Sequence, residues 1–274
     1  MRNRAKILGQ HFLKNDAALK KIAAALKLKA GDTVIEIGPG RGALTLPLAK
    51  ICAEVGCKIA AVEKDKELGS ELGSRVSGIG HRQVLEIKIG DILKILPNLT
   101  KPQTLNPKPY KLAGNIPYYI TGRLLRILSE LENKPEIAVF TLQKEVAERI
   151  AAKPPKMNLL AAVTQFWAEP EIIGYLKPGS FVPAPKVESA IIKLGSWVLG
   201  MGFREKEYYK FVKILFKQPR KTVLNNLRFG FKMTSEEVLK ILENQGFAGT
   251  ERPQDLSITM LIKLASAFRE KNML

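Results

Sequence analysis

The sequence contains little cysteine and little histidine, and it has no long apolar run. Two cysteines and two histidines occur among its 274 residues. Cys52 and Cys57 lie five residues apart without a surrounding His/Cys cluster, so they predict neither a metal site nor a framework of disulfides. We interpret both as structural or incidental thiols. His81 falls in a predicted loop, where we expect no catalytic role.

No apolar stretch approaches the roughly 20 residues that a membrane-spanning helix needs. The opening residues Met1-Arg2-Asn3-Arg4 are followed by no apolar segment of the signal-peptide type. Apolar residues make up 46% of the chain, which is enough for a sizeable core. We therefore expect a soluble, cytoplasmic globular protein that acts as a monomer without a metal ion or a membrane.

Acidic residues are also scarce relative to basic ones. The chain has 26 Asp and Glu against 44 Lys and Arg, which gives a net charge of +18. Such self-repulsion serves no purpose in an enzyme of small molecules, and a polyanionic partner explains it. The excess is concentrated in residues 1–29 and 204–232, with eight and nine basic residues. Solvated lysine surfaces are common, so charge alone leaves nucleic acid as one of two interpretations.

Between residues 33 and 143, short apolar runs alternate with helical stretches, a rhythm that predicts a parallel sheet with crossover helices. The runs are continuously apolar, as expected when helices cover both faces of the sheet. They are Thr33 to Ile37, Lys58 to Glu63, Glu86 to Ile89, Lys111 to Asn115 and Ile137 to Gln143. After Pro-rich loops, a further strand over Val187 to Leu194 completes the predicted sheet.

Beyond Leu194 the pattern is helical. The predicted helices are Tyr208 to Phe216, Arg220 to Phe229, Ser235 to Gln245 and Ser257 to Arg269, with Ser235 as an N-cap and Gly246 as a helix stop. The first of them carries Phe211, Ile214 and Leu215 on one face and lysines on another, which suits a helix lying along phosphates. We therefore predict two domains, residues 1–198 and residues 199–274.

The segment Val34-Ile35-Glu36-Ile37-Gly38-Pro39-Gly40-Arg41-Gly42 is a strand that runs into a Gly-rich turn, which predicts a site for a nucleotide-like cofactor. A nicotinamide dinucleotide is one alternative, because Gly38, Gly40 and Ala43 also satisfy G-x-G-x-x-A. S-adenosylmethionine is favoured by three polar residues at the carboxyl ends of successive strands, where open parallel sheets bind ligands. Glu63 ends the second strand, Asp91 follows the third and Asn115 ends the fourth.

These acids also have structural interpretations. Glu63 and Asp91 occupy positions where a carboxylate caps a helix, and Glu36 is expected to brace the Gly-rich turn without touching chemistry. Glu63 is suited to the ribose hydroxyls of a cofactor and Asp91 to an adenine amino group. Their occurrence together favours the binding interpretation.

Asn115-Ile116-Pro117-Tyr118 has what an enzyme needs to hold an exocyclic amino group. The lone pair of adenine N6 is delocalised into the ring, so N6 is a poor nucleophile. An amide oxygen and a backbone carbonyl beside Pro117 accept its hydrogens and favour a tetrahedral nitrogen, while Tyr118 stacks on the base. Taken alone, the same string is also a strand end followed by a Pro turn.

Several motifs together carry a family resemblance that runs nearly end to end. They are Gly9-Gln10-His11-Phe12-Leu13, Glu36-Ile37-Gly38-Pro39-Gly40, Glu63, Gly90-Asp91, Asn115-Ile116-Pro117-Tyr118, Gln143-Lys144-Glu145-Val146-Ala147, Phe181-Val182-Pro183-Ala184-Pro185-Lys186-Val187 and Arg220-Lys221-Thr222. At these motifs the chain resembles the small-subunit (16S) ribosomal RNA adenine N6,N6-dimethyltransferases, the kasugamycin-sensitivity enzymes.

This resemblance implies an α/β fold of the class I, Rossmann-like, S-adenosylmethionine-dependent methyltransferases, with a small all-helical C-terminal domain. It implies the transfer of four methyl groups to two adjacent adenosines near the RNA 3′ end, coupled to biogenesis of the small (30S) subunit. The implied cofactor contacts are His11, Leu13, Gly38, Gly40, Glu63, Asp91 and Asn115. His11 departs from the family, which usually has Asn there.

The implied catalytic set is Asn115, Ile116, Pro117 and Tyr118, with Phe181 closing over the second face of the base. Phe181 also has an ordinary interpretation as a core aromatic. We expect RNA phosphates to contact the basic N-terminal arm and the helical domain, through Arg2, Arg4, Lys6, Lys210, Lys213, Lys217, Arg220 and Lys221. The proton leaves N6 to water after attack, so we assign no general base.

Three other functions remain open at this point. A large-subunit adenine methylase of the macrolide-resistance type is the nearest, although Arg220-Lys221-Thr222 and Phe181 fit the small-subunit enzymes better. A non-catalytic ribosome assembly or transcription factor is the second. A nicotinamide oxidoreductase is the third, and it has no use for Asp91 and Asn115 at the strand ends.

Overall fold

The computed structural model describes residues 10–77, 83–101, 109–196 and 205–271. Arg2, Arg4, Lys6 and His81 lie outside them. Contacts divide the chain into two compact units, Met1–Ala147 with Glu171–Ser196, and Glu148–Pro170 with Trp197–Leu274. The helical unit therefore takes in Glu148–Pro170, a segment that the predicted boundary between residues 198 and 199 assigns to the first domain.

The first unit contains a seven-stranded sheet in the order β4-β3-β2-β5-β6-β9-β7. The first five strands run parallel, and β9 pairs antiparallel with β6. The strands are β2 (Thr33–Ile37), β3 (Lys58–Glu63), β4 (Leu85–Ile89), β5 (Tyr110–Asn115), β6 (Ile137–Gln143), β7 (Ala168–Leu176) and β9 (Ser189–Ser196). The predicted parallel sheet is confirmed, with end shifts of one or two residues.

The edge strand β7 was not predicted. Its sequence contains Pro170 and Gly174, and its exposure varies along its length, so it lacks the apolar run that marks the inner strands. Pro is tolerated there because an edge strand has one side without a ladder partner. The prediction of Val187 to Leu194 as a strand found the neighbouring β9, whose register with β6 runs from Ser189 opposite Gln143 to Gly195 opposite Ile137.

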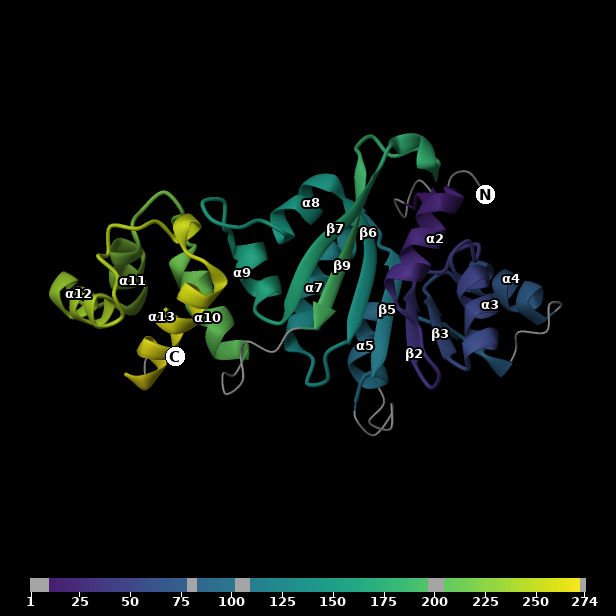
Figure 1. The fold of residues 1–274 in the computed structure, drawn as a ribbon, viewed down its shortest axis with the longest axis horizontal. Helices are drawn as coiled ribbons and strands as arrows, with labels where there is room; N and C mark the ends of the chain where they lie inside the picture. The colour runs from purple at the N-terminus through teal and green to yellow at the C-terminus, as the bar shows by residue number, and fades with distance from the viewer. Residues whose placement is uncertain (1–9, 78–82, 102–108, 197–204, 272–274) are drawn as a thin grey trace. The chain divides into compact units, whose positions relative to one another are not determined.

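Helices cover both faces of this sheet (Figure 1). The chain moves from β2 through β3 to β4 in one direction and from β5 to β6 in the other, so right-handed crossovers place α3 and α4 on one face and α7 on the opposite face. Contacts place α2 with α3, and α5 with α7. The bounds are α2 (Asp16–Ala25), α3 (Thr45–Val55), α4 (Lys66–Ser77), α5 (Ile92–Leu99), α7 (Thr121–Glu130) and α8 (Lys144–Ile150).

The reversal of strand order falls between β2 and β5, which are hydrogen-bonded neighbours. Ligands of open α/β sheets bind outside the carboxyl ends of the strands at such a point. The core beneath α2, α3 and α4 holds the sheet in place and includes Val34, Ala61, Ala113 and Val139, all fully buried. The fold therefore fixes the ends of β2, β3, β4 and β5 beside one another.

A second, two-stranded sheet joins the two ends of the first unit. β1 (Phe12–Leu13) pairs antiparallel with β8 (Phe181–Val182), so that Phe12 lies opposite Val182 and Leu13 opposite Phe181. The Lys14 N–H also donates to the Ser180 carbonyl in the short turn η3 (Pro178–Ser180) at 2.9 Å. Side chains of a strand alternate between faces, so the two members of each pair share a face.

The second unit is helical, as predicted. It contains α9 (Leu159–Gln165), α10 (Glu205–Leu215), α11 (Val223–Phe231), α12 (Ser235–Asn244), the turn η4 (Pro253–Asp255) and α13 (Ile258–Glu270). Its core includes Phe211, Leu227, Leu242 and Phe268. The predicted N-cap at Ser235 is wrong by one residue: Thr234 caps α12 in a capping box with Glu237, and Ser235 is the first helical residue.

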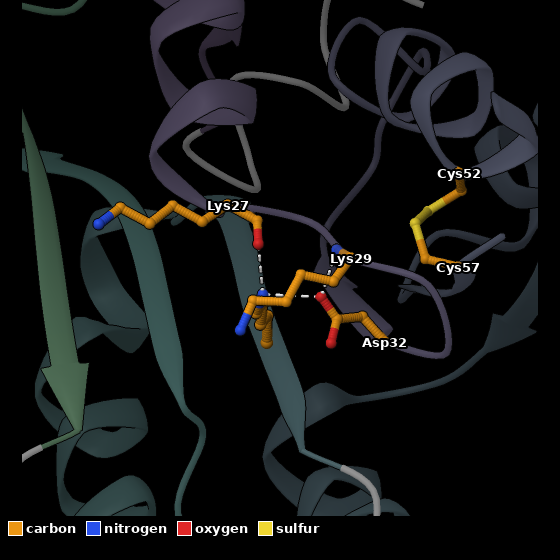
Figure 2. Close-up of a disulfide and its surroundings, with 6 residues drawn as sticks. Lys27, Lys29, Asp32, Cys52 and Cys57 are labelled. Atoms are coloured by element: carbon orange, nitrogen blue, oxygen red, sulfur yellow. Dashed lines mark hydrogen bonds and ion pairs between the residues drawn. A yellow bond between two sulfur atoms is a disulfide. The ribbon is translucent and has the colours of Figure 1, made fainter. Parts of the chain in front are cut away.

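The interpretation of Cys52 and Cys57 as structural or incidental thiols is wrong, because the two form a disulfide (Figure 2). Gly56 follows the end of α3 in a left-handed conformation with φ of 81°, which turns the chain back on itself. The Cα atoms of the two cysteines are therefore 4.4 Å apart, within disulfide range. Spacing alone did not reveal this, because the reversal depends on the backbone at Gly56.

Lys111 lies fully buried near the start of β5. Its Nζ is 2.7 Å from Oδ2 of buried Asp32 and donates to the Lys27 carbonyl at the same distance. The pair joins β5 to the segment that leads into β2. A buried charge is tolerated only when it is paired and hydrogen-bonded, and this one is both.

Candidate active site

A cleft of about 870 Å³ opens at the carboxyl ends of β2, β3, β4 and β5, part of it open to solvent. Residues from several of the predicted motifs line it. The lining comprises Gln10, His11, Phe12, Ile37, Gly38, Gly40, Val62, Glu63, Lys64, Asp65, Gly90, Asp91, Ile92, Asn115, Ile116, Pro117, Tyr118, Tyr119 and Ile120. The structure thus brings together the Gly-rich loop, the strand-end acids and the Asn115 segment.

The Gly-rich loop leaves space where a side chain would stand. Gly38 has a φ of 65°, and a Cβ added to it would meet no atom within 4 Å. A ligand can therefore approach its backbone directly. Gly40, with a φ of 54°, lies beneath the Phe12 ring, and a Cβ there would come within 2.8 Å of Cε1 of Phe12. Phe12 closes this side of the cleft.

Glu63, at the end of β3, is almost fully buried. Its two carboxylate oxygens accept from the backbone N–H groups of Gly40 and Asp65, each at 2.9 Å. Each oxygen has a second lone pair, so these bonds orient the carboxylate without using up its capacity to accept from the hydroxyls of a ribose. The N–H groups of Glu67 and Leu68 in the first turn of α4 donate to Asp65 and not to Glu63, so the structure favours the binding interpretation of Glu63 over the capping one.

Asp91 is a helix cap, and it also faces the cleft. It is the N-cap of α5, and Oδ1 accepts from the Leu93 N–H at 3.0 Å. Oδ2 lies 3.4 Å from Nζ of Lys64, which also lines the cleft. A carboxylate fixed in this way keeps acceptor capacity for an amino group, so the capping interpretation does not compete with the binding one.

Asn115 ends β5 and lies half-buried in the cleft. Its Nδ2 donates to the His11 carbonyl. Because a carbonyl oxygen only accepts, the amide must turn its NH₂ toward His11, and its Oδ1 is the atom that remains to accept a hydrogen bond. The chain before β1 therefore sets the orientation of the Asn115 side chain.

The His11 side chain is hydrogen-bonded to the segment that follows β8. Its Nδ1 lies 2.7 Å from the Pro183 carbonyl, which requires an N–H on Nδ1. The ring centroid is 5.8 Å from that of Tyr118. Leu13 is buried and lines a smaller cavity behind the Gly-rich loop, which measures about 420 Å³ with its solvent-open part and is also lined by Asn115 and Gly38.

Ile116, Pro117 and Tyr118 lead from β5 into the short turn η2 (Tyr118–Ile120). The Pro117 carbonyl accepts from the Ile120 N–H at 3.0 Å, and the buried Ile116 donates its own N–H to Thr141 at 3.1 Å. The Tyr118 hydroxyl is 2.9 Å from Oγ of Ser189. The phenol ring is thereby held at its outer end while it lines the cleft.

Phe181 does not line this cleft. Its side chain is 3% exposed and packs in the core with Leu13, its partner across the β1–β8 ladder. The opposite pair behaves differently: Phe12 lines the cleft and Val182 is 53% exposed. The one-residue alternation of the strand decides which aromatic faces the ligand site.

Glu36, in the middle of the motif, is buried, and its Oε2 has no hydrogen-bond partner within the described residues. Burial raises the pKa of this carboxyl to about 8, while the Thr45 side chain opposes the rise and the charge of Glu63 adds to it. It lines the smaller cavity behind the loop. At neutral pH the carboxyl is therefore largely protonated.

The predicted RNA contacts of the helical unit are all on its surface. Lys210 and Lys213 lie on the exposed side of α10, and Lys217, Arg220 and Lys221 follow in the exposed turn before α11. The apolar residues Phe211 and Leu215 of α10 are fully buried. The prediction of one apolar and one basic face is confirmed for this helix.

Several cleft residues were given no role in the sequence analysis, among them Phe12, Lys64 and Tyr119. The sequence gives no separate signal for Phe12 or Lys64, because the residues next to them in the chain are the ones that match a binding motif. Tyr119 is 58% exposed at the mouth of the cleft, next to Tyr118. A signal for it was present, since a second aromatic directly after the Asn115 segment has no place in the core.

Within the described ranges, no group of three or more His, Cys, Asp or Glu side chains is arranged to hold a metal ion. None of the helices in that part of the chain combines the length and the apolar character needed to cross a membrane.

The sequence matches the family described as ribosomal RNA adenine dimethylase over residues 1–264. A ribosomal RNA small subunit methyltransferase A of Dehalococcoides mccartyi (strain CBDB1) is 38% identical over 261 residues, covering 94% of this chain and 86% of the relative. A protein of the same name from Koribacter versatilis (strain Ellin345) is 36% identical over 277 residues, covering 96% of this chain and 94% of the relative.

Two solved structures are similar along nearly the whole chain. A dimethyladenosine transferase from Plasmodium falciparum has a TM-score of 0.80 and 28% identity, covering 96% of this chain and 98% of its own. The 23S rRNA methyltransferase ErmE has a TM-score of 0.73 and 25% identity, and the match covers 94% of this chain and 99% of ErmE. Both carry the class of fold predicted from the sequence.

Proposed function

The chain belongs to the ribosomal RNA adenine dimethylase family, and we propose that it dimethylates N6 of two adjacent adenosines near the 3′ end of small-subunit ribosomal RNA. The methyl donor is S-adenosylmethionine. We further propose that the substrate is the immature 30S subunit in the cytoplasm. The observation that carries this proposal is the Asn115 amide, whose fixed orientation leaves Oδ1 available in the cleft.

The cleft residues fit the cofactor. We propose that the backbone at Gly38 and Gly40 lies against it, that Glu63 accepts from the ribose hydroxyls, and that Asp91 accepts from the adenine amino group. The support is that Gly38 leaves open space and that both carboxylates are held by backbone N–H groups. The backbone of His11 and Leu13 would contact the rest of the cofactor, on the side of the cleft where Asn115 is hydrogen-bonded to His11.

When bound, S-adenosylmethionine would supply an electrophilic methyl carbon for attack by the N6 lone pair, with the neutral thioether as the leaving group. Asn115 Oδ1 accepts one N6 hydrogen and directs the lone pair toward that carbon. The second acceptor is the Ile116 or the Pro117 carbonyl; the Pro117 carbonyl accepts one hydrogen bond from the Ile120 N–H and keeps a second lone pair. N6 becomes acidic after attack and releases its proton to water, so no side chain serves as a base.

Tyr118 would stack on the adenine, because its ring lines the cleft and its hydroxyl is held by Ser189. The target base must leave its stack to reach this position. Phe181 as the second stacking surface stays a prediction, and it requires the ring to leave the core in which it packs. Orienting the two reactants contributes on the order of 7 to 11 kcal/mol to such reactions.

The test is methyl transfer from labelled S-adenosylmethionine to unmethylated small and large ribosomal subunits, followed by mass spectrometry of the RNA digests. We expect dimethyladenosine in the small subunit only. Label confined to the large subunit would instead support methylation of large-subunit RNA, the activity in the name of the 23S rRNA methyltransferase ErmE. Label in neither subunit, with cofactor binding intact in a calorimeter, would contradict the enzymatic proposal and favour an assembly factor.

A further inference from the structure

We propose that the outer face of α11 is a second RNA contact, in which Phe229 stacks on an unpaired base between phosphates held by Lys221 and Lys232. We call this surface the α11 stripe and define it as Lys221, Asn225, Arg228, Phe229 and Lys232. The inference rests on the proposed function, since it takes ribosomal RNA as the partner.

Phe229 is exposed in a helix whose other large apolar residues are turned inward. It is 67% exposed, the highest value among the exposed large apolar side chains of the described residues. Its neighbour Leu227 is fully buried, and Phe231 stacks on Phe268 with ring centroids 4.9 Å apart. The helical unit therefore has a core that Phe229 does not share. An aromatic ring held in water is available for a partner.

The ring is held in place by Arg228. The guanidinium carbon of Arg228 is 4.6 Å from the Phe229 ring centroid, and its Nη1 donates to Oγ of Ser235 in α12 at 3.0 Å. A cation over one face leaves the rest of the exposed ring for a base, and Arg itself contributes to stacking sites for nucleic acid. The platform is thus formed before any ligand binds.

Close packing at Gly230 fixes the rotation of α11 about its axis, and in this rotation Phe229 faces away from the core. A Cβ at Gly230 would come within 2.0 Å of Cγ2 of Ile214, so the α11 backbone packs directly against α10 at this point. Because Phe231 stacks on Phe268 one residue further on, the orientation of the last turn is fixed from both sides. The exposure of Phe229 is therefore a consequence of packing.

The charges around the ring suit RNA. Lys221 precedes the helix and Lys232 ends it, and both are exposed. Asn225 lies four residues before Phe229, on the same face of the helix. Residues 204–232 contain nine basic and two acidic side chains, so a polyanion fits this surface better than a protein or a second copy. Basic residues at both ends with an aromatic between them are typical of single-stranded nucleic-acid sites.

The experiment measures the affinity of the full-length protein for unmethylated small subunits at several salt concentrations. Phe229→Ala should lower affinity about 5- to 150-fold, the effect of losing one base–aromatic stack, without changing the salt dependence. Lys232→Ala should instead reduce the slope of log affinity against log salt concentration by up to about one. Tyr175→Ala removes a comparably exposed aromatic from the first unit and should leave affinity unchanged.

Phe229→Trp supplies the direct readout. It should restore affinity, and its fluorescence should be quenched on binding beyond the change seen with the wild-type protein, which contains two tryptophans. Wild-type affinity of Phe229→Ala, or unquenched emission from Phe229→Trp in the bound state, would overturn the inference. If the wild-type protein neither binds nor methylates small subunits in the same samples, the proposed function fails first, and the two failures are distinguishable.

Discussion

The Asn115 amide is fixed at one end and available at the other. Its Nδ2 is committed to the His11 carbonyl, so the substrate atom that Oδ1 can receive is a hydrogen-bond donor such as N6–H. The same bond ties the segment before β1 to the end of β5. Asn115 therefore links the position of the cofactor-contacting chain to the position of the base.

Replacing Asn115 by Ala should lower the rate of methyl transfer by about 100-fold or more, because one preorganised contact to the reacting nitrogen is lost. Cofactor affinity, measured by calorimetry, should fall less, since the Gly-rich loop and Glu63 are unchanged. Asn244→Ala, which alters an exposed amide in the helical unit, is the matched control. Turnover of Asn115→Ala equal to that of the control would contradict the assigned role.

Glu36 gives a prediction about pH. Its pKa of about 8 in the folded protein lies above the ordinary value of 4.5, so the folded state binds more protons than the unfolded state between these values. The contribution of Glu36 to the free energy of unfolding should therefore be greatest below about pH 4.5. It should fall by up to about 1.4 kcal/mol per pH unit as the pH rises toward 8.

Glu36→Gln keeps the shape but cannot ionise, so this decline should be absent from the variant. Urea unfolding of both proteins at pH 5, 6.5 and 8 provides the comparison. If the stability difference between wild type and variant does not change across that range, Glu36 is not protonated in the folded protein.

At the residue scale, the sequence identifies polar ligands better than it identifies aromatic ones. Glu63, Asp91 and Asn115 were predicted because each ends or closely follows an apolar strand, and all three line the cleft. Phe181 and Phe12 could not be distinguished in this way. Which ring faces the ligand depends on the register of a two-residue ladder, and two residues have no readable periodicity.

Among the elements, β5 depends on one buried ion pair. Lys111→Ala should cost about 3 to 5 kcal/mol in the free energy of unfolding, because it leaves the buried Asp32 carboxylate without its partner. The double variant Lys111→Met, Asp32→Asn should lose less than the single one. Urea unfolding measures both, and a double variant less stable than Lys111→Ala would show that the pair is not coupled as described.

The turn after α3 depends on Gly56 and on the disulfide that it permits. Reduction, or replacement of Cys52 and Cys57 by Ser, should lower the free energy of unfolding by roughly 2 kcal/mol, the value expected for so short a loop. Thiol titration in denaturant without reductant should find no free cysteine. Two titratable thiols in freshly purified, unreduced protein would contradict the disulfide.

Inner elements were predictable because burial on both faces produces apolar runs and because capping residues mark helix ends. The edge strand β7 was not, since its pattern is interrupted by Pro170 and Gly174. The disulfide was missed for a similar reason. Both features depend on the position of a neighbour in space, which a single sequence pattern does not contain.

For the whole molecule, the net charge of +18 predicts that binding to ribosomal subunits weakens steeply with salt. The double variant Lys213→Ala, Lys217→Ala should bind less tightly, and the slope of log affinity against log salt should fall by about 1.4 to 1.8. Lys240→Ala, an exposed lysine of α12, is the control. An unchanged slope in the double variant would remove these two lysines from the RNA contact.

The most direct test of the central claim is a crystal structure of the protein with S-adenosylhomocysteine and a bound adenosine nucleotide. We predict the thioether sulfur beside Gly38 and Asn115, with Asn115 Oδ1 hydrogen-bonded to N6 and room for a methyl carbon about 3 to 3.5 Å from that nitrogen. A ligand sulfur bound elsewhere, or an Asn115 amide turned away from the base, would contradict the account.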